Sequence, residues 1–283
     1  MTLTVCIPLA WCRLINYLYG EPVFFKGKYQ EDKIYDLYIQ QITCKFKLKE
    51  NMIPTIQIKG SLYFKGNEYL ESSDDDFVTL TLTNIDLELF LKHYNVEGLI
   101  YQCGWKFKSM KGIFDKYINK WITEKNEGTI EKNKGKRTRA KLMLNSLYGK
   151  FAKSMEMRSK IPFELGDDIV RFEFGESKEV KGLYLPVASF ITSYARKKTI
   201  ETSQAISDYS IKKYGVSKYV YSDTDSIHCL LDIEELKQFC EIDDVKLGAW
   251  KHESTFTKAK FIRQKCYIEI IDDEMKITCA RNA

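Results

Sequence analysis

Residues 218–231 read KYVYSDTDSIHCLL and place two aspartates between runs of apolar, β-branched and aromatic residues. This pattern predicts a β-hairpin that carries Asp223 and Asp225 at its tip. Two carboxylates held close together repel each other, and a divalent cation such as Mg²⁺ relieves the repulsion. The alternative is an ordinary turn with two solvated aspartates. The apolar strands on both sides argue against a tip that meets only solvent, and so favour a metal site.

Residues 141–151, KLMLNSLYGKF, are the second informative stretch. On a helix, four of them share one face: Lys141, Asn145, Tyr148 and Gly149. That face offers a cation for phosphate, a flat ring for a base or sugar, and a glycine for close approach, which is typical of a nucleotide-binding surface. The alternative, which the pattern supports equally, is a helix that buries its leucines and leaves the polar residues in solvent. Those leucines are Leu142, Leu144 and Leu147.

The segment 120–141 in front of this stretch is basic. It holds eight basic and three acidic residues, a net charge of +5 that equals the net charge of the whole chain. A charged run is usually a solvated helix face. Because the rest of the chain is neutral on balance, any attraction for phosphate or nucleic acid must be local to this segment.

The first half of the chain predicts strands and a helix. Residues 41–49 alternate apolar and polar side chains, and VTLTLT at 78–83 repeats the pattern, so both read as half-buried strands. The polar, acidic stretch 72–76 between them predicts a turn. A short helix is expected after Asn84, with three residues directed inward: Ile85, Leu89 and Phe90. The fold class is therefore mixed α and β.

Composition sets the outer limits. The 283 residues are 44% hydrophobic and 29% charged, as in globular proteins, and provide length for roughly two domains. No stretch approaches the ~20 apolar residues of a membrane helix, and the apolar run 1–12 lacks the basic region of a signal peptide. The eight cysteines show no C-x-x-C spacing, which argues against zinc and redox motifs and favours reduced, intracellular cysteines.

Taken together, the motifs closely resemble the family B DNA polymerases, specifically the protein-primed branch of small phages and linear plasmids. Four motifs occur in family order between about Arg13 and Thr278. K-x-x-x-N-S-x-Y-G is matched by Lys141, Asn145, Ser146, Tyr148 and Gly149; T-x-x-A-R by Thr192, Ala195 and Arg196; Y-x-D-T-D-S by Tyr221, Asp223, Thr224, Asp225 and Ser226; and K-x-Y by Lys265 and Tyr267. The tracts KLGAWKHE at 246–253 and YFKGNEYL at 63–70 also look like this branch.

The resemblance implies an α+β fold, a right-hand polymerase palm and fingers without an exonuclease domain or thumb. In this arrangement residues 1–23 are a degraded start of the palm, and 24–112 are the first terminal-protein-region insertion. Residues 113–152 are the fingers, two helices joined by the basic segment. Residues 153–183 are the second insertion, a β-hairpin, and 184–283 are the palm, truncated before the thumb.

The resemblance also implies roles for individual residues. Asp223 and Asp225 would hold the catalytic Mg²⁺ ions. The nucleotide would be bound by Lys125, Lys141, Asn145, Tyr148 and Gly149. Primer-template DNA would be contacted by Thr192, Arg196 and Ser226, and the primer end by Lys265 and Tyr267. The implied partners are primer-template DNA, deoxynucleoside triphosphates and a terminal protein primer, with no membrane, and the implied location is the cytoplasm of a bacterial host.

The chain departs from the family at both ends. The palm motif D-x-x-S-L-Y-P, which supplies another metal-binding aspartate, should precede Tyr19–Pro22 but is absent. Codons compatible with Met1–Pro8 encode Asp-Val-Asn-Ser-Leu-Tyr-Pro in a second reading frame. We therefore hypothesise a frameshift near Trp11–Arg13, which the nucleotide sequence would test directly. The end, TCARNA at 278–283, stops where relatives continue, and little or no polymerisation is expected from this chain.

Two other functions compete with a polymerase. One is a non-catalytic nucleic-acid-binding remnant with the same fold. The other is a metal-dependent nuclease, which would need a further acidic residue or a base near the aspartate pair; His228 is instead expected to pack or hydrogen-bond. Structural roles are expected for a capping box of Asp232 and Glu235 and for three core tryptophans: Trp105, Trp121 and Trp250.

Overall fold

The structure is a computed structural model of the whole chain. It describes residues 2–4, 16–58, 69–154, 156–164, 166, 169–180, 184–243, 246, 248–263 and 265–279. The frameshift region 11–13, most of the tract 63–70 and the end of the chain after 279 lie outside these ranges.

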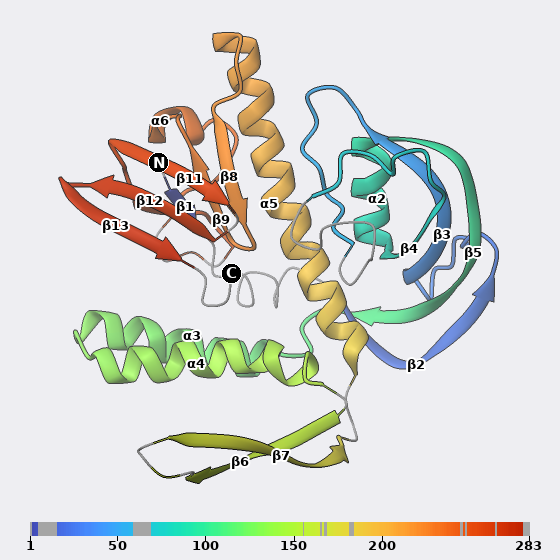
Figure 1. Cartoon of the computed structure of the whole chain (residues 1–283), viewed down its shortest axis with the longest axis horizontal. Coiled ribbons are helices and arrows are strands. Elements are labelled where there is room, and N and C mark those ends of the chain that lie inside the picture. Colours follow the sequence, from blue (N-terminus) through green and yellow to red (C-terminus); the bar gives the residue numbers. More distant parts are fainter. Residues whose placement is uncertain are drawn as a thin grey trace.

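A 30-residue helix, α5 (Leu185–Tyr214), runs through the centre of the molecule between two groups of strands (Figure 1). A proline stands in its first turn, where a missing backbone N–H costs nothing. The helix ends at Gly215, whose φ of 72° is the left-handed conformation that glycine adopts without strain. Both ends of α5 are thus set by local sequence.

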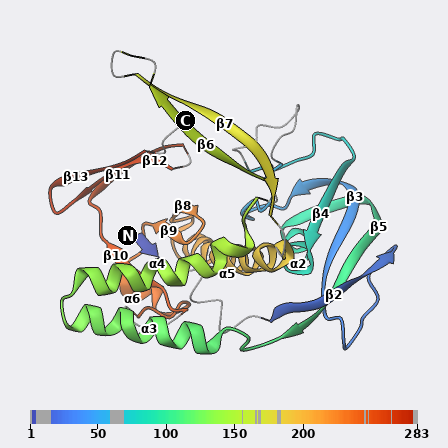
Figure 2. The same cartoon turned by 90° about the horizontal axis from the view of Figure 1, so that it is seen from below.

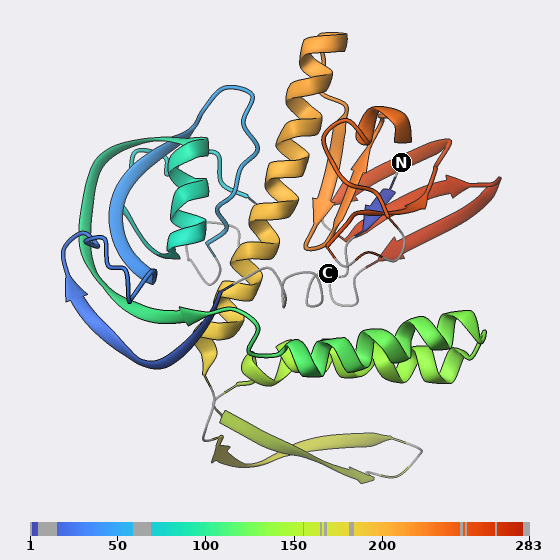
Figure 3. The same ribbon diagram turned by 180° about the vertical axis from the view of Figure 1, so that it is seen from behind.

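A strongly curved antiparallel sheet lies on one side of α5 (Figure 3). Its strand order is β2 (Tyr17–Lys26), β5 (Tyr94–Met110), β3 (Leu37–Leu48), β4 (Val78–Thr83). Helix α2 (Asn84–His93) begins at the N-cap Thr83 and buries Ile85, Leu89 and Phe90. The two predicted strands and the predicted helix are confirmed.

The expectation for Trp105 is wrong. Its side chain is 46% exposed and meets the Phe24 ring edge to face. Trp105 shares a face of β5 with the buried Phe107 two residues on, but it lies further along the strand, opposite Phe24 of the edge strand β2, where it is left exposed. Trp121 is half-buried, whereas Trp250 is a core residue as expected.

Two smaller sheets lie on the other side of α5. The first has the order β10 (Lys251–Ser254), β1 (Thr2–Thr4), β9 (Ser226–Cys229), β8 (Tyr219–Asp223). The second is the three-stranded β11 (Lys258–Arg263), β12 (Cys266–Ile271), β13 (Glu274–Cys279). Trp250, Ile206 of α5 and Ile227 of β9 belong to the core that joins the first sheet to α5.

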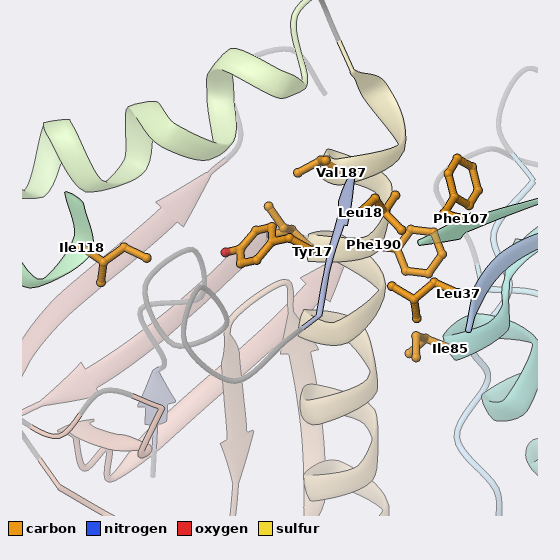
Figure 4. Packing of buried hydrophobic residues seen from close by; sticks show 9 residues of the cluster. Tyr17, Leu18, Leu37, Ile85, Phe107, Ile118, Val187 and Phe190 are labelled. Atoms are coloured by element: carbon orange, nitrogen blue, oxygen red, sulfur yellow. The ribbon is translucent and has the colours of Figure 1, made fainter. Parts of the chain in front are cut away.

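Two helices packed side by side, α3 (Asp115–Ile130) and α4 (Lys134–Phe151), extend from the lower part of α5 past the smaller sheets (Figure 2). Their base is fixed by a cluster to which Ile118 of α3, Tyr17 of β2 and Phe190 of α5 belong. Tyr17 is directed toward Ile118, and Phe190 lies beside Phe107 (Figure 4). Beyond them lies the exposed two-stranded hairpin of β6 (Glu156–Glu164) and β7 (Val170–Glu179).

Within the described ranges, no helix combines the length and apolar character needed to cross a membrane. Four cysteines in these ranges are free thiols: Cys44, Cys103, Cys240 and Cys266. The predicted capping box is present, because the Asp232 side chain accepts from the Glu235 N–H and the Glu235 side chain accepts from the Asp232 N–H. It begins α6 (Ile233–Leu236), a single turn.

Glu235 also ties α6 to the end of α5, and this network predicts a pH dependence. Lys213 and Tyr214 donate hydrogen bonds to its carboxylate, and they lower the pKa of Glu235 to about 2. The carboxyl of a glutamate in the unfolded chain titrates near 4.3. The contribution of this network to the free energy of unfolding is therefore complete above that pH and is lost as the pH falls toward 2. We expect Glu235→Gln to cost about 1 kcal/mol at pH 7. Urea denaturation between pH 7 and pH 3 should show this difference shrinking below pH 4.

The neighbouring Glu234→Gln is the matched control. Glu234 pairs only with Lys237 among the described contacts, and both side chains are largely exposed, so its effect should stay within about 0.5 kcal/mol. A Glu235→Gln difference that is constant over the whole pH range would contradict the assignment.

Candidate metal and nucleotide site

The two aspartates lie at the end of a tight hairpin. Strands β8 and β9 are antiparallel, with Asp223 opposite Ser226, and Thr224 and Asp225 form the two-residue turn. Thr224 has a φ of 44°, so the turn is left-handed at a β-branched residue. Its hydroxyl donates to Asp223 Oδ1 at 3.1 Å, and the Ser226 hydroxyl donates to the Asp223 carbonyl at 3.1 Å. The predicted hairpin is confirmed, and Ser226 is engaged within the turn.

Burial is the largest influence on Asp225 and raises its pKa. The charges of Asp223 and Glu253 raise it further, whereas the charge of Lys141 lowers it. Three carboxylates and one ammonium group from separate elements therefore act on one another here. Glu253 lies on β10 and was not among the predicted site residues, although the tract 246–253 had been noted. A bound cation would relieve the repulsion that raises the pKa of Asp225.

Among the residues that the structure describes, no three His, Cys, Asp or Glu side chains are close enough together to hold a metal ion. The strand next to the hairpin adds no carboxylate. Thr2–Thr4 of β1 pair with β9, with Thr4 opposite Ser226, and the first acidic residue of the sequence is Glu21. The carboxylates that this part of the structure could offer to a cation are the aspartate pair, with the charge of Glu253 acting on Asp225.

The predicted residue Lys265 reaches the same place from the three-stranded sheet. Its ammonium nitrogen is 3.7 Å from Asp223 Oδ2, and its backbone N–H donates to the Tyr221 hydroxyl at 2.9 Å. Burial raises the pKa of Tyr221 to about 12, so the hydroxyl is neutral at physiological pH. A ring cluster joins this sheet to the hairpin, with centroids 5.0–5.8 Å apart: Tyr221, His228, Phe261 and Tyr267.

His228 packs inside this cluster and is fully buried. Its Nδ1 lies 3.1 Å from Glu269 Oε1, and burial lowers its pKa, so the ring is neutral. The expectation that His228 packs and hydrogen-bonds is confirmed, and the residue offers no exposed base for a nuclease.

Helix α4 presents the predicted face. Lys141, Asn145 and Gly149 are exposed, and Tyr148 is half-buried against the cluster at the base of the helices. The alternative of three buried leucines is wrong for Leu142, which is 62% exposed, whereas Leu144 is buried. The buried face of helix α4 therefore includes Leu144 but does not extend to Leu142.

Two of the eight basic residues of the segment 120–141 are paired within it. Lys136 contacts Glu127 and Glu131, and Arg139 contacts Glu124 across the two helices. The charge of Lys141 acts instead on Asp225, whose pKa it lowers. Lys125 is half-buried on α3, and no described contact joins it to the aspartate pair.

The two predicted DNA contacts on α5 are occupied within the protein. Arg196 forms an ion pair with Asp86 in the first turn of α2. The Thr192 hydroxyl donates to the Ser189 carbonyl one turn earlier, at 2.8 Å. In contrast, the Thr199 hydroxyl of the same helix donates to the Thr224 carbonyl in the turn, a contact that sequence reasoning missed.

Comparison with known proteins decides the family. Residues 15–241 match the family model described as DNA polymerase type B, organellar and viral. The chain belongs to this family. The resemblance to phage family B polymerases is thereby confirmed, and DNA polymerases use divalent metal ions in general.

Curated members of the family share extensive sequence with the chain. It is 45% identical to the DNA polymerase of Bacillus phage phi29 over 257 residues, covering 89% of this chain and 42% of the relative. It is 36% identical to the DNA polymerase of Streptococcus phage Cp-1 over 260 residues, covering 90% and 43%. The chain thus spans less than half the length of the curated relatives it matches.

Solved structures of the family share the fold. The chain superposes on phi29 DNA polymerase complexed with primer-template DNA and incoming nucleotide with a TM-score of 0.88 at 39% identity, covering 100% of this chain and 50% of that one. The complex of the same polymerase with single-stranded DNA gives 0.81 at 38% identity, covering 99% and 50%. The mixed α/β fold is that of half of a phage DNA polymerase.

Proposed function

We propose that this chain forms the palm and fingers of a protein-primed family B DNA polymerase. It would hold primer-template DNA, a deoxynucleoside triphosphate and Mg²⁺ around the β8–β9 hairpin. One observation carries the proposal: Asp223 and Asp225 lie together at the tip of the β8–β9 hairpin, with the Lys265 ammonium nitrogen 3.7 Å from Asp223 Oδ2. The charge of Lys141 on α4 also acts on Asp225. Carboxylates suited to a metal ion and ammonium groups suited to phosphate thus come to this place from separate elements.

The regions follow from this assignment. Residues 184–283 would be the palm and 113–152 the fingers, which in the structure are α3 and α4 with the basic excess. Residues 24–112 would be the first insertion, built around the curved sheet. Residues 153–183 would be the second insertion, and the protruding β6–β7 hairpin supports this division (Figure 1).

The chemistry would be templated nucleotide addition. Mg²⁺ ions held by Asp223 and Asp225 would neutralise phosphate charge and stabilise the attacking and leaving oxygens. Lys141, assisted by Lys125, would bind the triphosphate, while Asn145, Tyr148 and Gly149 would contact the base and sugar. Positioning and charge neutralisation supply most of the catalysis in phosphoryl transfer, and these side chains are suited to both.

Contacts with DNA would involve Thr192, Arg196 and Ser226, with Lys265 and Tyr267 at the primer end. The position of Lys265 beside Asp223 supports the last assignment. Arg196 would have to exchange its ion pair with Asp86 for a phosphate. We further propose that the first insertion binds a terminal protein primer. The protein would act in the cytoplasm of the host.

A second candidate function is a non-catalytic nucleic-acid-binding remnant of such a polymerase. It is favoured by the strand β1, which lies beside the hairpin without an acidic residue.

Metal binding tests the proposed site without requiring catalysis. Mn²⁺ titration of the purified chain, followed by electron paramagnetic resonance, should reveal a site that Asp225→Asn weakens about tenfold, because one of the paired carboxylates loses its charge. Asp76→Asn is the matched control, since it removes the same charge from an exposed turn far along the sequence. Mn²⁺ affinity that is identical in Asp225→Asn and the unaltered chain would refute the metal site.

A further inference from the structure

The hairpin turn is held in an unusual conformation. Thr224 has a φ of 44°, in the left-handed region that β-branched residues rarely adopt. Such strain persists only where surrounding contacts determine the backbone, and it is concentrated at functional sites. Thr224 separates Asp223 from Asp225, so its backbone angles set the spacing of the two carboxylates.

Most hydrogen bonds at the turn begin and end within the hairpin. The Thr224 and Ser226 hydroxyls donate to Asp223, and the Asp225 N–H donates to the Asp223 carbonyl. These bonds would move with the hairpin. The pairing of β9 with β1 and the Lys265 contacts fix the strands and the Asp223 side chain against the rest of the protein. The Thr224 peptide between the two aspartates needs a contact of its own.

Thr199 of α5 supplies such a contact. Its side chain is only 5% exposed, and its Oγ1 donates to the Thr224 carbonyl at 3.0 Å. Among the described residues, it makes the one hydrogen bond that reaches the turn backbone from another element. Helix α5 is itself anchored here, because Ala195 and Ile206 belong to the core beneath the hairpin.

We infer that Thr199 is a positioning residue: its hydroxyl holds the Thr224 peptide in the left-handed conformation and thereby keeps Asp223 and Asp225 at the spacing that binds a divalent cation. Thr199 would touch neither metal nor substrate. The inference rests on the proposed function, because it assigns Thr199 to the metal site proposed above.

Mn²⁺ titration of the full chain tests the inference with two substitutions. Thr199→Val keeps the shape of the side chain and removes the hydroxyl, so Mn²⁺ affinity should fall about fivefold. Thr199→Ser keeps the donor, so affinity should stay near that of the unaltered chain. Thr202→Val makes the same chemical change on the same helix at a residue without a described hydrogen bond to the hairpin, and should change nothing.

The outcomes separate the inference from the proposed function. Unaltered affinity in Thr199→Val, together with weakened binding in Asp225→Asn, would overturn the inference alone. An equal loss in Thr199→Ser would also overturn it, because the hydroxyl would not be the cause. Absence of any Asp225-dependent site in the unaltered chain would overturn both. Circular dichroism would establish folding, and Thr199→Ala would replace Thr199→Val if that variant does not fold.

Discussion

Primer extension by this 283-residue chain should be at least about 10³-fold slower than by a full-length phage relative assayed beside it. Two-metal catalysis needs enough carboxylates to hold both ions through the reaction. The hairpin provides Asp223 and Asp225, and β1 beside it brings none. Loss of a metal ligand that acts in the transition state costs several kcal/mol, about 4 kcal/mol for a 10³-fold loss in rate.

Extension of a labelled primer would be measured with Mg²⁺ and with Mn²⁺. The rate of the Asp225→Asn variant, measured in the same way, would be subtracted as background. Mg²⁺-dependent extension at a rate near that of the relative, lost in Asp225→Asn, would contradict the prediction. It would show that another carboxylate completes the site. Glu253 would be tested first by Glu253→Gln, because its charge already acts on Asp225.

Lys141→Gln should weaken binding of a deoxynucleoside triphosphate about 30-fold. A charge-assisted hydrogen bond to a phosphate contributes about 2 kcal/mol, which corresponds to that factor. Lys141 is exposed on α4 and its charge acts on Asp225, so we expect a metal-bound triphosphate to lie between them. The affinity would be measured by fluorescence anisotropy of a labelled nucleotide, with the chain bound to a primer-template that ends in a dideoxynucleotide.

Lys134→Gln is the matched control, because it removes the same charge from the exposed first turn of the same helix. We expect at most a twofold effect, arising from the general positive potential and weakening with added salt. If both substitutions weakened binding equally, the basic segment would act through its summed charge and Lys141 would have no specific role.

Elements with a strong local pattern were predictable from sequence. The alternation in 41–49 and 78–83 and the Asp-Thr-Asp hairpin all appear where expected, because each pattern depends on neighbours a few residues away. The exposure of Leu142 could not be predicted in this way. Helical spacing identifies the residues that share a face, but the width of the buried stripe depends on what packs there, and α4 leaves Leu142 in solvent.

The site was only partly predictable for the same reason. The charge of Glu253 acts on Asp225 because β10 pairs with β1, which in turn pairs with β9. Thr199 hydrogen-bonds to the turn because α5 passes beneath it. Neither residue carries a local signal, since both depend on contacts between distant segments. The T-x-x-A-R motif lies on α5, and its arginine is paired with Asp86, a partner that no spacing rule identifies.

The length of α5 has a consequence for how the molecule can come apart. At 1.5 Å per residue its 30 residues span about 45 Å, and the helix contributes side chains to the cores on both of its sides: Ala195 and Ile206 to one, Val187 and Phe190 to the other. Neither group of strands can open without exposing part of this shared helix. Slow amide hydrogen exchange along α5 would therefore report on both groups at once, and we expect the two to open as one cooperative unit.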